Sequence, residues 1–235
     1  VMGIDSTVAM YIAAAIIISY TFLGGFSAVC WTDFFQGLMM LGAILLVPIA
    51  MATFGQFDTS YYTAFAEGVS EFNTNAFAAS PADIISGLAW GLGYFGMPHI
   101  LVRFMAIKKP SMVKKSATVA IIWVVLALVA VIFIGTFGRM LIGADLLGKG
   151  AQDMVFVQLS RDLFPAGVTG FLLAAIIAAS MSTADSQLLV ASSSFTSDIY
   201  KPIIRKDASE SEVLWVGRTV VVIVAIIAFF IASWG

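Results

Sequence analysis

The segment from Ala178 to Ser194 reads AASMSTADSQLLVASSS, a stretch of nearly membrane-spanning length that combines many hydroxyl groups with one carboxylate, Asp185. Hydrocarbon offers such oxygen atoms no hydrogen-bond partners, so polar side chains at this depth usually face a cavity, an ion or another helix. Because Asp185 lies in the middle of the predicted helix, it cannot serve as a helix cap. We therefore expect its carboxylate to meet a cation or a neighbouring hydroxyl group.

Helical geometry gathers several of these oxygen atoms on one side of the segment. At 100° per residue, one face carries four residues and Asp185 flanks it; the four are Ala179, Ser182, Thr183 and Ser186. That face presents hydroxyl oxygens together with the free lone pair of the Ala179 carbonyl. Na⁺ is a small, hard cation that prefers oxygen ligands of this kind. The spacing therefore predicts a membrane protein that handles ions.

A second candidate site lies in the run WGLGYFGMPH, which begins at Trp90 and ends at His99. Its three glycines and one proline disfavour a continuous helix. Interrupted helices at membrane depth are tolerated where the backbone lines a cavity, and they build substrate sites in secondary transporters. Trp90 and Tyr94 are four residues apart, so on a helix they project to one side and wall such a pocket. The alternative is a kinked helix packed through its glycines, since glycine and proline are common in membrane helices.

Asp33 lies in the sequence GGFSAVCWTDFFQG, where the second long apolar run begins. An aspartate within a membrane segment is a candidate functional residue by default. The alternative is a structural role, in which Thr32 or Asp33 caps the N-terminus of a helix. The two interpretations are compatible, and both are kept at this point.

Composition places these motifs in a bilayer. Of 235 residues, 60% are hydrophobic and only 11% are charged, and the mean hydropathy is +1.00. A soluble domain usually carries about 25% charged residues. The net charge of −2 comes without a basic cluster suited to nucleic-acid binding. The single cysteine, Cys30, excludes an internal disulfide, and the single histidine excludes a His-rich metal site.

Six apolar runs approach the roughly 20 residues that a helix needs to cross a bilayer. We expect an all-α, multi-pass protein of the cytoplasmic membrane, with one transmembrane domain over residues 1–235 and spans at about 8–23, 34–54, 84–106, 117–137, 166–190 (extending to about 200) and 213–233. Two long connections remain, 55–83 and 138–165, and the first has room for a short interfacial helix. The ends of the chain lead us to expect an internal piece of a longer protein.

Lysine and arginine placement predicts the orientation of the spans. The connection after the third span carries only basic charges, from Arg103 to Lys115, and the connection after the fifth carries Lys201, Arg205 and Lys206. The segment between the second and third spans is acidic instead. Connections from odd to even spans are therefore expected in the cytoplasm, including the tight turn at Gly24–Gly25. Such basic connections would also face the headgroups of membrane lipids.

Three segments together resemble the sodium:solute symporter family, and within it the proline-transporting members. They are FLGGFSAVCWTD, LAWGLGYFGMPHILVRFMA and AAIIAASMSTADSQLLVASSSFTSDIYK followed by ESEVLWVGR, in the order and spacing of the family. The resemblance implies a partial LeuT-like fold, which is built from two inverted five-helix repeats around a central site. It also implies that full members are about twice as long as this chain.

The resemblance assigns roles to several positions. It implies a Na⁺ site at Ala179, Ser182 and Thr183, completed by carbonyl groups that lie upstream of Val1. It implies a second Na⁺ site in some members, here at Asp33, Asp185 and Ser186. It places the substrate against the broken helix, at Trp90, Tyr94, Met97 and Pro98. Enteric proline symporters have a glutamine where this chain has Met97, so one hydrogen-bonding group is missing near the pocket.

The function implied is Na⁺-coupled symport of proline, with Na⁺ as the coupling ion and a small solute as substrate. One alternative keeps the fold but changes the cargo to another amino acid, a carboxylate or a sugar. Another is a membrane sensor or channel-like subunit, although no signalling module or filter-like segment is visible. An enzyme is disfavoured, because Asp33, Asp185 and His99 show no nucleophile–base or metal-ligand spacing.

Overall fold

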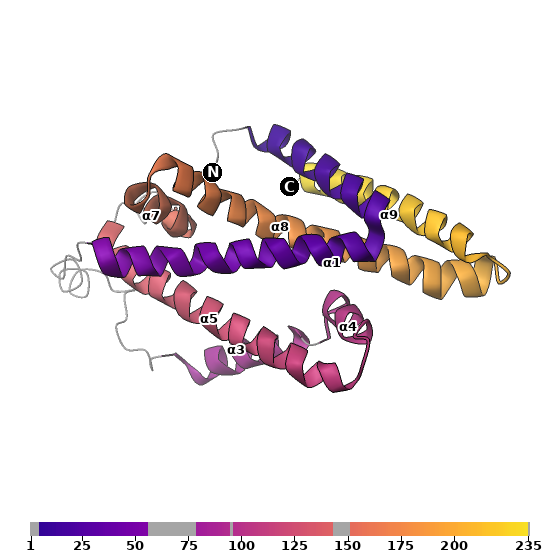
Figure 1. Cartoon of the computed structure of the whole chain (residues 1–235), viewed down its shortest axis with the longest axis horizontal. Helices are drawn as coiled ribbons and strands as arrows, with labels where there is room; N and C mark the ends of the chain where they lie inside the picture. Colours follow the sequence, from indigo (N-terminus) through magenta and orange to yellow (C-terminus); the bar gives the residue numbers. More distant parts are fainter. Residues whose placement is uncertain (1–4, 56–78, 95, 143–150, 235) are drawn as a thin grey trace. The chain divides into compact units, whose positions relative to one another are not determined.

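The computed structural model describes residues 5–55, 79–94, 96–142 and 151–234. Every regular element in those ranges is a helix (Figure 1): α1 (Ser6–Phe54), α3 (Pro81–Tyr94), α4 (Pro98–Met105), α5 (Ser111–Ile142), η1 (Gln152–Met154), α7 (Val155–Leu163), α8 (Ala166–Ser194), the π-helical η2 (Phe195–Ile204) and α9 (Glu210–Ser233). The expected all-helical class is confirmed for this part of the chain. The interfacial helix considered for the first long connection falls on residues 56–78, outside the described residues.

Four helices are long and apolar enough to cross a membrane among the described residues. They are Thr7–Phe54, Ser111–Ile142, Ala166–Ile204 and Glu210–Ser233. The pair α3 and α4, bent by 45°, would add a fifth if it forms one broken span. Large apolar side chains cover the outer faces of these helices, and Leu92 and Met105 are 80% and 82% exposed. Surfaces of this kind are stable only in an apolar surrounding, as the composition predicted.

The long helix α1 is broken at Gly25 into two legs, residues 6–24 and 26–54. Gly25 has φ 54° and ψ −146°, a conformation that a residue with a side chain rarely adopts. The tight turn expected at Gly24–Gly25 is therefore confirmed. The second leg begins directly after the turn rather than at Phe34, because nothing in the sequence between them stops a helix.

The chain forms two compact units, which we describe separately. The first contains residues 1–40 and 174–235. In it α9 runs beside the first leg of α1, where the rings of Tyr11 and Phe229 lie 4.6 Å apart (Figure 1). α8 is joined to α9 by the Ser192 hydroxyl, which donates to the Gly217 carbonyl at 2.6 Å. Of these helices, α1 and α8 carry the residues of the candidate ion site.

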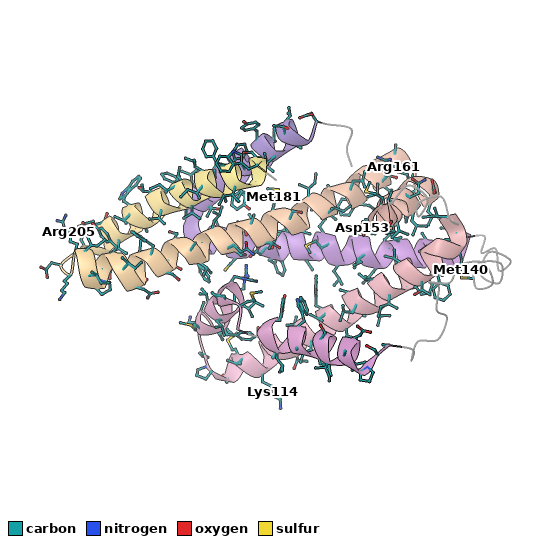
Figure 2. All side chains as sticks on the ribbon, turned by 180° about the vertical axis from the view of Figure 1, so that it is seen from behind. Lys114, Met140, Asp153, Arg161, Met181 and Arg205 are labelled. Carbon is teal, nitrogen blue, oxygen red and sulfur yellow. The ribbon has the colours of Figure 1, made fainter. Side chains whose placement is uncertain are left out.

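The second unit contains residues 41–173. Its helix α7 packs closely on α5, since a Cβ atom at Gly138 would lie 2.8 Å from Val155 Cγ2 and 3.1 Å from Leu159 Cδ1. Figure 2 shows the side chains of this short helix, from Asp153 just before it to Arg161. The connection predicted over 138–165 is therefore wrong at both ends: α5 continues to Ile142, and η1 and α7 follow. The 3.6-residue apolar pattern of a nine-residue helix is short enough to be missed.

Candidate ion and substrate sites

Asp185 is the most completely buried charged residue in the described part of the first unit, with 0% of its surface exposed. The hydroxyl group of Tyr20, from the first leg of α1, donates to Asp185 Oδ2 at 2.5 Å. Asp185 lies well inside α8, as expected. Its partner in the structure is thus a hydroxyl group, which was one of the two partners predicted.

Asp33 faces the same stretch of α8 from the second leg of α1. The hydroxyl group of Ser182 donates to Asp33 Oδ1 at 2.5 Å. The N-cap interpretation of Asp33 and Thr32 is wrong, because both residues lie inside the helix that starts after Gly25. Thr32 instead directs its hydroxyl back to carbonyl groups of the preceding turn. Asp33 is therefore available to interact across helices.

Ser186 connects the two carboxylates. Its Oγ lies 3.3 Å from Asp185 Oδ1 and 3.5 Å from Asp33 Oδ2, and 2.8 Å from the Ser182 carbonyl. A hydroxyl group has one proton and two lone pairs, so Ser186 can donate to only one of these acceptors at a time. We call Asp33, Ser182, Asp185 and Ser186 the aspartate–serine cluster. The structure thus brings together the three residues expected at the second Na⁺ site.

The cluster concentrates negative charge within membrane-spanning helices. Two carboxylates that share hydroxyl donors repel each other, and a cation between them would offset that repulsion. Among the described residues, no group of three histidine, cysteine, aspartate or glutamate side chains could hold a metal ion. The oxygen atoms of the cluster belong to carboxylates, hydroxyls and a carbonyl, which suit a hard cation better than a soft one.

The residues of the first predicted Na⁺ site share one face of α8. The Thr183 hydroxyl donates to the Ala179 carbonyl at 3.1 Å, and Thr183 is exposed. Ser182 donates to Asp33. Each hydroxyl group donates its hydrogen bond within the protein, and its oxygen lone pairs can still coordinate a cation. This geometry is compatible with the predicted ligand set and does not by itself test it.

Two residues of this region were missed by sequence analysis. Tyr20 lies in an apolar run, although its neighbours Ser19 and Thr21 also carry hydroxyl groups. Gln36 follows Asp33 by three residues, so the two share a helix face. The Oε1 atom of Gln36 is buried without a hydrogen-bond partner in the described part of the chain. The spacing of Asp33 and Gln36 was the signal that could have identified it.

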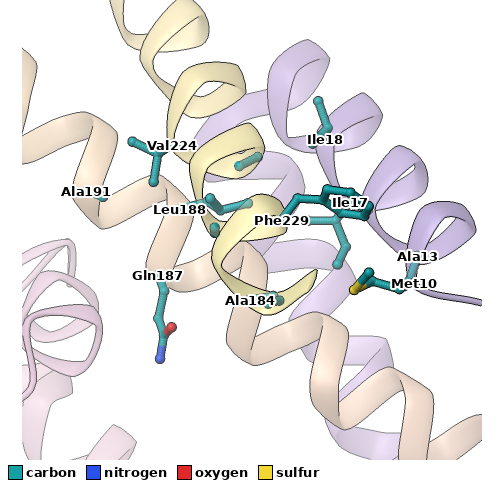
Figure 3. A pocket seen from close by; sticks show the side chains of 14 residues that line it. Met10, Ala13, Ile17, Ile18, Ala184, Gln187, Leu188, Ala191, Val224 and Phe229 are labelled. Carbon is teal, nitrogen blue, oxygen red and sulfur yellow. The ribbon is translucent and has the colours of Figure 1, made fainter. Parts of the chain in front are cut away.

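An apolar cavity of about 430 Å³ lies beside the cluster helices, between the first leg of α1, α8 and α9 (Figure 3). Most of its lining is alanine and branched aliphatic side chains. Gln187 is its polar residue, and its amide points away from Ile17 and Phe229 in this view (Figure 3). This cavity therefore offers no set of converging oxygen atoms.

The predicted substrate segment belongs to the second unit. α3 ends at Tyr94 and α4 begins at Pro98, so the interruption of the third span is confirmed. Trp90 and Tyr94 project to one side, and their rings stack with centroids 5.3 Å apart. Met97 is the N-cap of α4, in extended conformation, and Pro98 is its first residue. Trp90 and Tyr94 are 71% and 44% exposed, and their part in a substrate pocket stays a prediction.

Comparison with known proteins identifies the family. The model of the sodium:solute symporter family matches residues 1–234. The chain belongs to this family. It is 40% identical over 235 residues to the high-affinity proline transporter PutP of Bacillus subtilis (strain 168), in a match that covers 99% of this chain and 49% of that protein.

Two further relatives show the same pattern. The sodium/proline symporter 2 of Staphylococcus saprophyticus is 45% identical over 235 residues, with 98% of this chain and 45% of the relative covered. The sodium/proline symporter of Escherichia coli (strain K12) is 39% identical over 239 residues, in a match that covers 98% of this chain and 47% of that protein. The chain thus spans about half the length of these relatives. All three names describe transporters rather than enzymes.

Proposed function

We propose that this chain is the ion-binding part of a secondary transporter that couples Na⁺ entry to the uptake of proline across the cytoplasmic membrane. Family membership and the names of the relatives support this proposal. Since the chain spans about half of their length, a further segment is proposed to complete the transporter. No nucleic acid takes part in this function.

The observation that carries the proposal is the aspartate–serine cluster. Carboxylates in membrane helices are costly and are usually functional, and here the buried Asp185 and the half-buried Asp33 converge with hydroxyl groups from two helices. We propose Asp33, Asp185 and Ser186 as ligands of one Na⁺, with the buried Gln36 Oε1 nearby. Ala179, Ser182 and Thr183 would contribute to a second Na⁺, together with carbonyl groups from the completing segment.

The architecture proposed for the whole transporter is a LeuT-like fold in one transmembrane domain. The two legs of α1 would count as separate crossings, and α3 with α4 as one broken crossing. With α5, α8 and α9 this gives six crossings in the chain, with the Gly25 turn and the η2–α9 connection on the cytoplasmic side.

Coupling follows from the placement of the Na⁺ ligands on different helices. An ion held by two rigid elements stabilises the conformation in which both sets of ligands meet, and a substrate that prefers this conformation binds more tightly. Such coupling must be reciprocal and typically amounts to about 1–3 kcal/mol, or about 5–150-fold in affinity. Trp90, Tyr94, Met97 and Pro98 are proposed to contact the substrate. Because the Met97 side chain offers no strong hydrogen-bonding group, a solute less polar than proline is a second candidate for the substrate of the same fold.

The test is uptake of radiolabelled proline by the complete transporter in cells that lack other proline carriers. We expect accumulation against a gradient with external Na⁺ and none when K⁺ replaces Na⁺. Proline accumulation that does not depend on external Na⁺ would refute the coupling. Na⁺-driven uptake of another solute but not of proline would keep the coupling and replace the cargo, whereas no uptake of any solute would support a sensor.

A further inference from the structure

A second cavity of about 430 Å³ lies at the end of the first unit, separate from the aspartate–serine cluster. The break of α1 at Gly25, the segment η2 and the beginning of α9 enclose it. Its lining has an apolar part and a polar part. Aliphatic side chains such as Leu189, Val213 and Val221 form one part, and charged or hydroxyl-bearing side chains form the rest. A cavity of this volume is in the usual range for sites that bind small molecules or headgroups.

Two basic side chains line the polar part. Arg218 is fixed in place: its Nη2 donates to the Leu23 carbonyl at 3.1 Å, and its guanidinium lies 5.0 Å from the centroid of the Trp215 ring. This leaves the other guanidinium N–H groups in a preset direction, as phosphate recognition requires. Lys201 contributes an ammonium group on a flexible stem from η2. Together they favour an anionic group in the cavity.

Thr21 provides an independent sign of a ligand. Its side chain lines the cavity and is 1% exposed, and its Oγ1 has no hydrogen-bond partner among the described residues. A buried hydroxyl without a partner is unfavourable, and a ligand oxygen that accepts its hydrogen bond would remove that cost. Phe26, the first residue of the second leg of α1, also lines the cavity.

We propose that this cavity binds the phosphodiester group of a membrane phospholipid headgroup. The connections that form it are expected at the cytoplasmic face, where the aliphatic wall would meet the acyl chains. Glu210 also lines the cavity and offers a carboxylate to a headgroup ammonium. We therefore expect phosphatidylethanolamine to bind more tightly than phosphatidylglycerol. This site does not depend on the transport function proposed above.

The experiment is native mass spectrometry of the purified protein in detergent, titrated with phosphatidylethanolamine. We expect saturable binding of one lipid, with an apparent affinity about tenfold lower in Lys201→Gln. The matched control is Lys206→Gln, which removes the same charge from an exposed position of the same connection outside the cavity lining. It should bind the lipid like the original protein. An equal loss in both variants would show only general charge attraction and would overturn the site.

A second variant tests the part played by the Thr21 hydroxyl. Thr21→Val keeps the shape of the side chain, so we expect about threefold weaker lipid binding without a lower melting temperature. Unchanged binding by this variant would contradict the role of the buried hydroxyl.

Two further measurements identify the ligand. Inorganic phosphate is added in competition: if it displaces the lipid at similar concentration, the site takes soluble phosphate and the lipid assignment is wrong. Glu210→Gln should remove the preference for phosphatidylethanolamine over phosphatidylglycerol. An unchanged preference would contradict the ammonium contact.

Discussion

At the scale of single residues, hydroxyl groups determine what the carboxylates of this protein can do. Each carboxylate of the aspartate–serine cluster accepts a hydrogen bond from a hydroxyl group on another helix, Asp33 from Ser182 and Asp185 from Tyr20. These donors help to hold the two carboxylates in position. If the proposed Na⁺ site is correct, ligands that are already held in position would lower the cost of binding the ion.

Removing the hydroxyl groups of the α8 face should weaken Na⁺ binding. For Ser182→Ala combined with Thr183→Ala, we expect the Na⁺ concentration for half-maximal uptake by the complete transporter to rise about tenfold, equivalent to about 1.4 kcal/mol. The control is Ser180→Ala, whose hydroxyl is exposed and donates to the Ile176 carbonyl of its own helix. Unaltered Na⁺ dependence in the double variant would refute the ligand assignment.

Replacing Tyr20 should destabilise the cluster. Tyr20→Phe keeps the ring and removes only the donor to Asp185, so the buried carboxylate loses a partner at a cost of about 1–3 kcal/mol. We expect a lower melting temperature of the protein in detergent. Tyr11→Phe is the matched control, because this ring is in the same helix leg and its hydroxyl has no hydrogen bond among the described residues. Equal melting temperatures for the two variants would argue against the Tyr20–Asp185 contact.

At the scale of elements, the break of α1 positions the two helix faces that hold Tyr20 and Asp33. The two legs bring these residues to one helix, α8, although no charge or proline marks the turn. The turn depends on one residue with positive φ. Arg218 adds a contact from α9 to the Leu23 carbonyl group, just before the turn.

Substituting Gly25 should therefore be more harmful than substituting a glycine within the helix. Gly25→Ala must adopt φ 54°, which costs a residue with a side chain about 1–3 kcal/mol. Gly37→Ala is the control, since a Cβ atom there meets nothing within 4 Å and alanine favours a helix. In thermal unfolding in detergent, the melting temperature of Gly25→Ala should be lower than that of the original protein, and that of Gly37→Ala should not. A lower melting temperature for Gly37→Ala than for Gly25→Ala would mean that the turn at Gly25 is not required for stability.

At the scale of the whole molecule, the distribution of basic residues predicts which connections face the cytoplasm. In a Cys30→Ser background, Lys109→Cys should be protected from a membrane-impermeant maleimide in intact cells, because the basic connection after α4 is expected inside. Ala82→Cys, exposed at the start of α3, should react from outside. Labelling of both positions, or of Lys109→Cys alone, would contradict the proposed orientation.

Much of this protein could be predicted from its sequence, because the bilayer imposes simple rules on a chain. Apolar runs of sufficient length must be helical, so each predicted span falls on a helix, although the second leg of α1 starts before Phe34 and α7 was missed. The interrupted third span followed from its glycines and proline, and the hydroxyl face of α8 from helical periodicity. The paired glycines likewise indicated the turn at Gly24–Gly25. These features depend on residues that are neighbours in the chain.

The tertiary structure alone decided which helices face one another. Tyr20 and Asp185 are 165 residues apart, and Asp33 and Ser182 are 149 apart, so no local pattern could pair them. For the same reason a capping role was kept open for Asp33 beside the functional one, and the cavity around Thr21 was overlooked. Periodicity shows which side of a helix is polar, but only the packing of helices determines which groups that side meets.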